Sequence, residues 1–161
     1  MHYQELGLDQ GIPVVWAHGW ARTGRDWYNV ADAVSTRYRH ALLDLPGHGA
    51  TPRPDEAWDT AAYADDAARW IKETYGGPVY WVGHSFGCRV GTCLAAQHPD
   101  LVKGMVLVAA AGLKRQRKGM EALKFAYRSN SYKLLKAVLP EGYRESLRHR
   151  YSSADYLNAG E

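Results

Sequence analysis

A serine lies between two glycines in the segment Gly83–Gly87, which reads Gly-His-Ser-Phe-Gly. The strand-forming run Val79 to Val82 leads into this segment, and a stretch with helical character follows it. Such a junction predicts a sharp, strained turn that requires glycine-sized neighbours two positions on either side of the serine. We therefore expect the turn to present the Ser85 hydroxyl above the end of a sheet, where it could act as a nucleophile.

A nucleophilic serine needs a neighbouring base, and the oxyanion that forms when it attacks a carbonyl needs two N–H donors. In a turn of this kind the residue after the nucleophile, here Phe86, supplies one backbone donor. A loop after an earlier strand supplies the other, and His18, Gly19 and Trp20 follow the apolar run Ile12 to Ala17. We expect the backbone N–H of Trp20 to be the second donor.

Candidates for the base and its orienting acid are few. After Ser85 the chain contains only the histidines His98 and His149 and the aspartates Asp100 and Asp155. None of these four stands where it would complete a catalytic triad.

Histidines nearer the turn are better interpreted as structural residues. His84 should point away from Ser85, because consecutive strand residues face opposite sides of a sheet. His18 and His48 lie in loops near the expected pocket mouth, and His98 lies about three helical turns from Ser85. We expect these histidines to anchor loops.

The segments that would position these residues alternate between short apolar runs and helix-like stretches, as in a parallel sheet with helices on its faces. The expected strands are 12–17, 40–44, 79–82 and 102–109, and the expected helices are 27–38, 59–75 and 86–97. Residues 113–161 show amphipathic helical spacing and no further strand. We therefore divide the chain into an α/β part, residues 1–112, and a helical part, residues 113–161.

Composition limits the classes of function. With 161 residues, 46% of them hydrophobic and 23% charged, the chain can build one globular core. No run approaches the ~18 apolar residues of a membrane span, and the first ten residues lack a secretory signal, so we expect a cytoplasmic protein. Cys88 and Cys93 face different directions on a helix, which favours packing roles over a disulfide or a metal site.

Charge is uneven along the chain. Residues 1–112 carry 9 Lys/Arg against 12 Asp/Glu, whereas residues 113–161 carry 11 against 5. A basic tail could attract nucleic acid or anionic lipid. Its basic residues are spread among acids and aromatics, which favours a solvated helical face and no nucleic-acid partner.

Three motifs together resemble the α/β-hydrolase family, specifically its cofactor-free serine hydrolases. They are His18-Gly19-Trp20, the Asp-Leu-Pro-Gly-His-Gly segment at 44–49, and Gly83–Gly87, in the family's order. The resemblance implies a mostly parallel sheet flanked by helices, and a partial helical cap over residues 113–161. It also implies an esterase-like enzyme that cleaves small acyl substrates through an acyl-enzyme, without metal, nucleotide or flavin.

In that family the site residues would have the following roles. Ser85 would be the nucleophile, and the backbone N–H groups of Trp20 and Phe86 would form the oxyanion hole. His18, Gly19 and His84 would lie beside the substrate pocket.

This chain departs from the family pattern at its C-terminal side. Family members continue past the cap into strands whose loops carry the acid and the histidine base, and this chain stops first. A truncated gene, a half-protein completed by a second chain, and a self-complementing homo-oligomer all fit this pattern. The alternative function is a catalytically silent α/β fragment that acts as a binding or assembly module through an open sheet edge.

Overall fold

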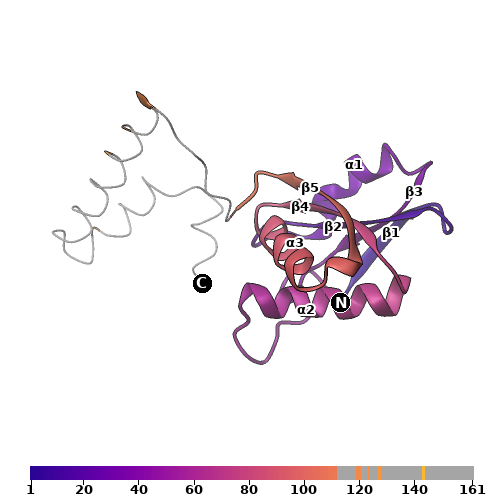
Figure 1. Ribbon diagram of the computed structural model, residues 1–161, viewed down its shortest axis with the longest axis horizontal. Coiled ribbons are helices and arrows are strands. Elements are labelled where there is room, and N and C mark those ends of the chain that lie inside the picture. Colours follow the sequence, from indigo (N-terminus) through magenta and orange to yellow (C-terminus); the bar gives the residue numbers. More distant parts are fainter. Residues whose placement is uncertain (112–118, 121–122, 124–126, 128–142, 144–161) are drawn as a thin grey trace. The chain divides into compact units, whose positions relative to one another are not determined.

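The computed structural model describes residues 1–111, together with Gly119, Met120, Leu123, Tyr127 and Tyr143. The chain forms two compact units, Met1–Gly112 and Leu113–Glu161. In the first unit a sheet lies between helices on its two faces (Figure 1). The expected helical cap over residues 113–161 falls almost wholly outside the described residues, so it stays a prediction.

Five strands form the sheet of the first unit. They are β1 (Tyr3–Gly7), β2 (Ile12–Ala17), β3 (Tyr38–Leu43), β4 (Val79–His84) and β5 (Val102–Val108). Their order across the sheet is β1-β3-β2-β4-β5, and only the β1–β3 pair is antiparallel. The mostly parallel α/β sheet expected from the alternating pattern is therefore confirmed.

Helices cover both faces of this sheet. They are α1 (Tyr28–Asp32), α2 (Thr60–Tyr75) and α3 (Phe86–Gln97), with the short 3-10 segments η1 (Gly24–Trp27) and η2 (Pro99–Leu101). The helix α2 begins where the Asp59 carboxylate accepts a 2.9 Å hydrogen bond from the Ala62 N–H. It ends at Gly76, whose φ of 65° is the left-handed conformation that glycine adopts without strain.

The expected helix over residues 27–38 is wrong in its extent. Regular helix ends at Asp32, and Tyr38 already pairs with Ile12 of β2. The next residue of β3, Arg39, pairs with both β1 and β2, so sheet pairing on both sides overrides the helical spacing. Val30, one of the apolar residues behind that spacing, is 52% exposed and marks no buried stripe.

The larger core lies between the sheet and the helices α2 and α3. At its centre the fully buried Trp81 of β4 donates an indole hydrogen bond of 3.0 Å to the Gly87 carbonyl at the start of α3. Gly91, one turn further along α3, passes directly over the indole ring of Trp81. This close approach brings the start of α3 onto the strand that precedes it.

Replacing Gly91 with alanine should therefore destabilise the protein. The new methyl group would collide with the Trp81 indole ring, and overpacking of a core typically costs about 1–3 kcal/mol. That loss exceeds the roughly 1 kcal/mol that alanine gains over glycine in a helix. Urea unfolding measures the difference, with Gly77→Ala as the control because a Cβ there meets nothing within 4 Å. A Gly91→Ala protein as stable as wild type would contradict the expectation.

Candidate active site

Ser85 occupies the strained turn that the glycine spacing predicts. Its φ of 48° and ψ of −102° place it between β4 and α3, and its side chain makes no capping hydrogen bond to the helix. A Cβ at Gly83 would lie 2.7 Å from the Cys88 nitrogen, and one at Gly87 would collide with the Ala17 carbonyl. Only glycine fits on either side, and Ser85 itself remains half-buried.

The end of β5 holds this turn from the other side. The Ser85 N–H donates a 3.0 Å hydrogen bond to the Val108 carbonyl, and the Ala111 N–H donates one of 3.4 Å to the Ser85 carbonyl. The Cys88 thiol also donates to the Val108 carbonyl, at 3.3 Å. Burial raises the pKa of this thiol, so Cys88 serves as a packed hydrogen-bond donor.

The loop after β2 passes directly beside Ser85. The Gly87 N–H donates a 3.0 Å hydrogen bond to the His18 carbonyl, which joins the loop to the start of α3. A Cβ at Gly19 would lie 3.5 Å from the Ser85 Cβ and 2.7 Å from His84 Nδ1, so glycine is required for this approach. We call the segment His18–Gly24 the β2 loop.

The two expected donors, Trp20 and Phe86, each directly follow a residue of this turn region: Trp20 follows Gly19, and Phe86 follows Ser85. Trp20 belongs to the β2 loop, and Phe86 is the first residue of α3. Within residues 1–111 neither backbone N–H donates a hydrogen bond to another protein group. Unpaired N–H groups beside a half-buried hydroxyl are the chemical requirement for stabilising an oxyanion.

His18 lies underneath the β2 loop and is 1% exposed. Its Nε2 accepts a 3.0 Å hydrogen bond from the Leu45 N–H, so its Nδ1 carries the proton and donates 2.7 Å to the Gly19 carbonyl. Burial lowers the pKa of His18 and outweighs the opposing effect of the Gly19 carbonyl. With both nitrogens engaged, His18 anchors the loop, and its burial does not favour the expected place in the pocket lining.

The other three histidines expected to anchor loops contact groups other than the Ser85 hydroxyl. His48 lies 3.0 Å from the Pro46 carbonyl through Nδ1, and His98 pairs with Asp65 at 2.8 Å near the far end of α3. The His84 ring lies 6.4 Å from that of Trp27, on the α1 side of the sheet. Within the described part of the chain, no side chain forms a hydrogen bond with Ser85 Oγ.

Aromatic rings surround the start of α3. The ring of Trp20, which is 40% exposed, meets the Phe86 ring edge-on at 5.1 Å between centroids, and Tyr63 of α2 meets Phe86 at the same distance. Trp58 packs against Tyr63 in turn, at 5.4 Å. The sequence pointed to Trp20 and Phe86 only, because nothing in the helical spacing of α2 indicates that Tyr63 faces Phe86.

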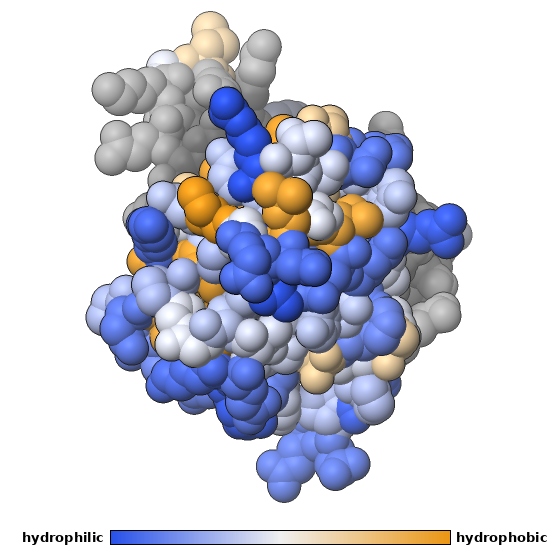
Figure 2. Space-filling model, turned by 90° about the vertical axis from the view of Figure 1, so that its right-hand side faces the viewer, coloured by the Kyte–Doolittle hydropathy of each residue, from blue (hydrophilic) through white to orange (hydrophobic). Residues whose placement is uncertain are grey.

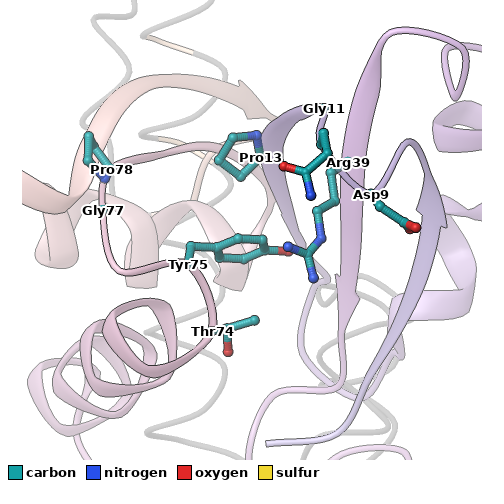
Figure 3. Close-up of a pocket in the computed structure, with 9 residues that line it drawn as sticks. Asp9, Gly11, Pro13, Arg39, Thr74, Tyr75, Gly77 and Pro78 are labelled. Atoms are coloured by element: carbon teal, nitrogen blue, oxygen red, sulfur yellow. The ribbon is translucent and has the colours of Figure 1, made fainter.

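A separate cavity of about 250 Å³ lies at the opposite end of the strands (Figure 3). Pro13 and Arg39 line it near the starts of β2 and β3, whereas Ser85 follows the end of β4. The Arg39 guanidinium stacks over the Tyr75 ring at 5.0 Å. Burial raises the pKa of Tyr75 to about 12. Because the cavity lies at the starts of the strands and Ser85 at the end of β4, the cavity is no part of the Ser85 site.

The surface at this opposite end is mixed in character. Figure 2 views it directly and shows apolar side chains in the upper half, bordered by strongly hydrophilic ones. Leu8 and Ile12 are among the exposed large apolar residues of the first unit.

Comparison with known proteins decides the family. The family described as alpha/beta hydrolase fold matches residues 12–153. The chain belongs to the α/β-hydrolase fold family. This α/β-hydrolase chain is 40% identical over 104 residues to a pimeloyl-[acyl-carrier protein] methyl ester esterase of Chromobacterium violaceum, which covers 65% of the chain and 39% of that relative.

Two further relatives are informative. An (E)-2-((N-methylformamido)methylene)succinate hydrolase of Acinetobacter baylyi is 33% identical over 122 residues, covering 76% of the chain and 45% of that relative. The crystal structure of an E-2-(acetamidomethylene)succinate hydrolase superposes with a TM-score of 0.64 at 27% identity, covering 92% of the chain and 53% of that structure. The α/β-hydrolase chain thus spans about half the length of these relatives or less.

No helix among the described residues of this α/β-hydrolase chain is long and apolar enough to cross a membrane.

Two buried histidines should titrate below the usual histidine range. Burial lowers the pKa of both His18 and His40 from 6.5, and His40 Nδ1 also accepts a 2.9 Å hydrogen bond from the Trp16 indole. Below about pH 6.5 the unfolded chain then binds protons that the folded chain does not, so the free energy of unfolding falls as the pH falls. Histidine NMR titration measures both pKa values, and urea unfolding at pH 7.5 and pH 5 measures the change in stability.

The variant His40→Gln separates the contributions of His18 and His40 to the pH dependence of stability. It removes one of the two groups whose pKa is lowered, so its stability should depend less on pH than that of wild type. NMR titration midpoints at or above pH 6.5 for both His18 and His40 in the folded protein would contradict the expected lowering of their pKa values.

Proposed function

We propose that this chain carries the nucleophile and the oxyanion hole of a serine hydrolase that cleaves ester-like acyl substrates. The observation that carries the proposal is the left-handed Ser85, half-buried and free of capping, with the β2 loop beside it at Gly19. Within residues 1–111 the N–H groups of Trp20 and Phe86, which follow Gly19 and Ser85, donate to no other protein group. The curated relatives support this reaction class, since they are named a methyl ester esterase and a succinate hydrolase.

In the proposed reaction Ser85 Oγ attacks the carbonyl carbon of the substrate. Its proton passes to a base, and the tetrahedral oxyanion accepts hydrogen bonds from the Trp20 and Phe86 N–H groups. Removing one such donor typically costs about 3–4 kcal/mol of transition-state stabilisation. The alcohol departs with a proton, and water then attacks the acyl-enzyme and releases the acid and free Ser85.

The acyl group would rest on the aromatic surface around the start of α3. Phe86 is buried, and the exposed edge of Trp20 stands beside it. Gly19 of the β2 loop approaches both Ser85 and His84, and we propose that Gly19 and His84 lie beside the substrate pocket. An apolar or aromatic acyl group would gain most from such a surface.

The base and its orienting acid come from outside residues 1–111. His18 is neutral, with both nitrogens engaged, and His98 is paired with Asp65 near the far end of α3. A second chain, or a second copy of this one, would bring them if it extended the sheet at β5. Among the described residues β5 pairs only with β4, and Val106 on this strand is 57% exposed.

The same open edge supports the second candidate function, a binding or assembly module without catalysis. An unpaired strand edge with exposed apolar side chains is a template for pairing with another chain. Met105 and Val108 are exposed on this strand together with Val106. Only the catalytic function requires the Ser85 hydroxyl, so replacing Ser85 distinguishes the two candidate functions.

Ser85→Ala should abolish reaction with a fluorophosphonate probe and lower hydrolysis of a chromogenic short-chain ester by at least about 10³-fold, because the nucleophile is lost. Intact-protein mass measures the adduct, and ester turnover at rigorous purity measures the rate. Ser35→Ala is the control, since Ser35 lies in the turn before β3. Equal ester rates in wild type and Ser85→Ala, with no adduct on wild type, leave only the assembly function.

Val106→Lys should prevent self-association through β5. A lysine on an edge strand opposes pairing with another strand, because its charge would be buried in the joined sheet. Analytical ultracentrifugation over a range of concentrations measures the effect. Val30→Lys is the matched control, since Val30 is 52% exposed on α1, away from the edge. A wild-type protein that stays monomeric would rule out pairing of a second copy at β5.

A further inference from the structure

We propose that Asp44 is a positioning residue for the oxyanion hole, because it fixes the far end of the β2 loop that carries the Trp20 N–H. This inference rests on the proposed function of Ser85. Asp44 follows β3, and its carboxylate accepts a 2.9 Å hydrogen bond from the N–H of Gly24, the last residue of the β2 loop. Within residues 1–111 Asp44 forms no hydrogen bond with Ser85, Trp20 or Phe86, so its effect acts through the backbone.

The β2 loop is fixed at its two ends by different groups. At its start, the His18 ring accepts from the Leu45 N–H, and the His18 carbonyl accepts from the Gly87 N–H. At its end, the Asp44 carboxylate holds Gly24, which is buried so closely that a Cβ there would lie 2.7 Å from the Leu42 carbonyl carbon. Trp20 lies between these anchors, and its N–H direction depends on both.

The middle of the loop is strained, which explains why two anchors are needed. Ala21, directly after Trp20, has a φ of 56°, in the left-handed region that non-glycine residues rarely adopt. Such a conformation costs on the order of 1–3 kcal/mol and persists only where surrounding contacts impose it. The Arg22 N–H closes the turn on the Gly19 carbonyl at 3.2 Å, and the Asp44 contact then prevents the rest of the loop from relaxing.

Asp44 is itself held firmly in its charged form. Its second oxygen accepts from the Ala50 N–H at 2.9 Å and lies 3.1 Å from His2 Nδ1. Burial acts to raise the pKa of Asp44, but the hydrogen bonds from Ala50 and Gly24 and the contact with His2 outweigh it and lower the pKa. Hydrogen bonds to an ionised carboxylate are stronger than those to a neutral acceptor.

These contacts make Asp44→Asn an informative substitution. Both carboxylate oxygens face backbone N–H groups, so an amide in either orientation turns its own N–H₂ group toward one of them. The carboxylate also packs against Gly49, whose φ is 54° and where a Cβ would collide with it. A longer side chain therefore has no room, and asparagine is the substitution that conserves volume.

The test uses phenylboronic acid, which does not require the catalytic base. Boron accepts a bond from Ser85 Oγ and becomes a tetrahedral anion while the serine proton passes to solvent, so the adduct imitates the oxyanion. Boron NMR identifies the tetrahedral adduct, and titration gives its dissociation constant. Asp44→Asn should weaken the adduct on the order of tenfold by displacing the Trp20 N–H.

Asp26→Asn is the matched control, since Asp26 lies two residues after Gly24 and its side chain pairs with Arg22. Its dissociation constant should stay within about twofold of wild type, as expected for an exposed ion pair. An Asp44→Asn protein with a lower melting temperature but an unchanged dissociation constant would show a purely structural role and overturn the inference.

Two further results distinguish a failure of the proposed Ser85 function from a failure of the proposed role of Asp44. If wild type forms no tetrahedral adduct, or if Ser85→Ala forms it equally well, the proposed function of Ser85 is contradicted, whatever the role of Asp44. If Asp44→Asn does not fold, hydrogen exchange on wild type decides: phenylboronic acid should slow exchange of the Trp20 and Gly24 amides together. Slower exchange of Trp20 alone would show that the Asp44 contact is uncoupled from the donor.

Discussion

The approach of the α3 start to the end of β2 is the contact on which the site depends. Gly87 packs directly on the Ala17 carbonyl, and its N–H donates to the next carbonyl, that of His18. No residue with a Cβ fits at Gly87, so the helix can begin this close to the strand only with glycine there. This approach turns Ser85 into its left-handed conformation and places the β2 loop beside it. A shift of α3 away from β2 would separate Ser85 from the β2 loop that contains Trp20.

The same turn connects Ser85 to the sheet edge. Val108, at the end of β5, accepts from both the Ser85 N–H and the Cys88 thiol. Ala109, immediately after β5, is another non-glycine residue with positive φ, at 48°. Strained backbone therefore follows β2, β4 and β5 alike, at the carboxyl ends where ligands bind in open α/β sheets. A strand that pairs with β5 would therefore act directly on the backbone that supports Ser85.

Local patterns were sufficient to predict the elements that carry their own start and stop signals. Asp59 and Gly76 delimit α2, and the glycines around Ser85 require the turn before α3. The extent of α1 could not be predicted this way, because the pairing of Tyr38 with β2 depends on strands distant in sequence. Tyr63 beside Phe86 and Asp44 beside Gly24 were missed for the same reason: each contact exists only after the sheet has assembled.

Serine catalysis requires both stabilisation of an oxyanion and transfer of a proton, and the residues that the structure describes bear differently on the two. Within residues 1–111 the groups suited to stabilising negative charge are backbone groups: the N–H groups of Trp20 and Phe86 and the N-terminus of the 12-residue helix α3, whose dipole favours negative charge beside Phe86. Proton transfer needs a side chain with a free nitrogen, and the nearby His18 has both nitrogens engaged and a pKa lowered by burial. The backbone donors proposed for an oxyanion hole are fixed as soon as β2, β4 and α3 pack, whereas a histidine base could be carried by any segment that reaches Ser85. In the proposed reaction the geometry around the oxyanion therefore does not depend on which segment supplies the base.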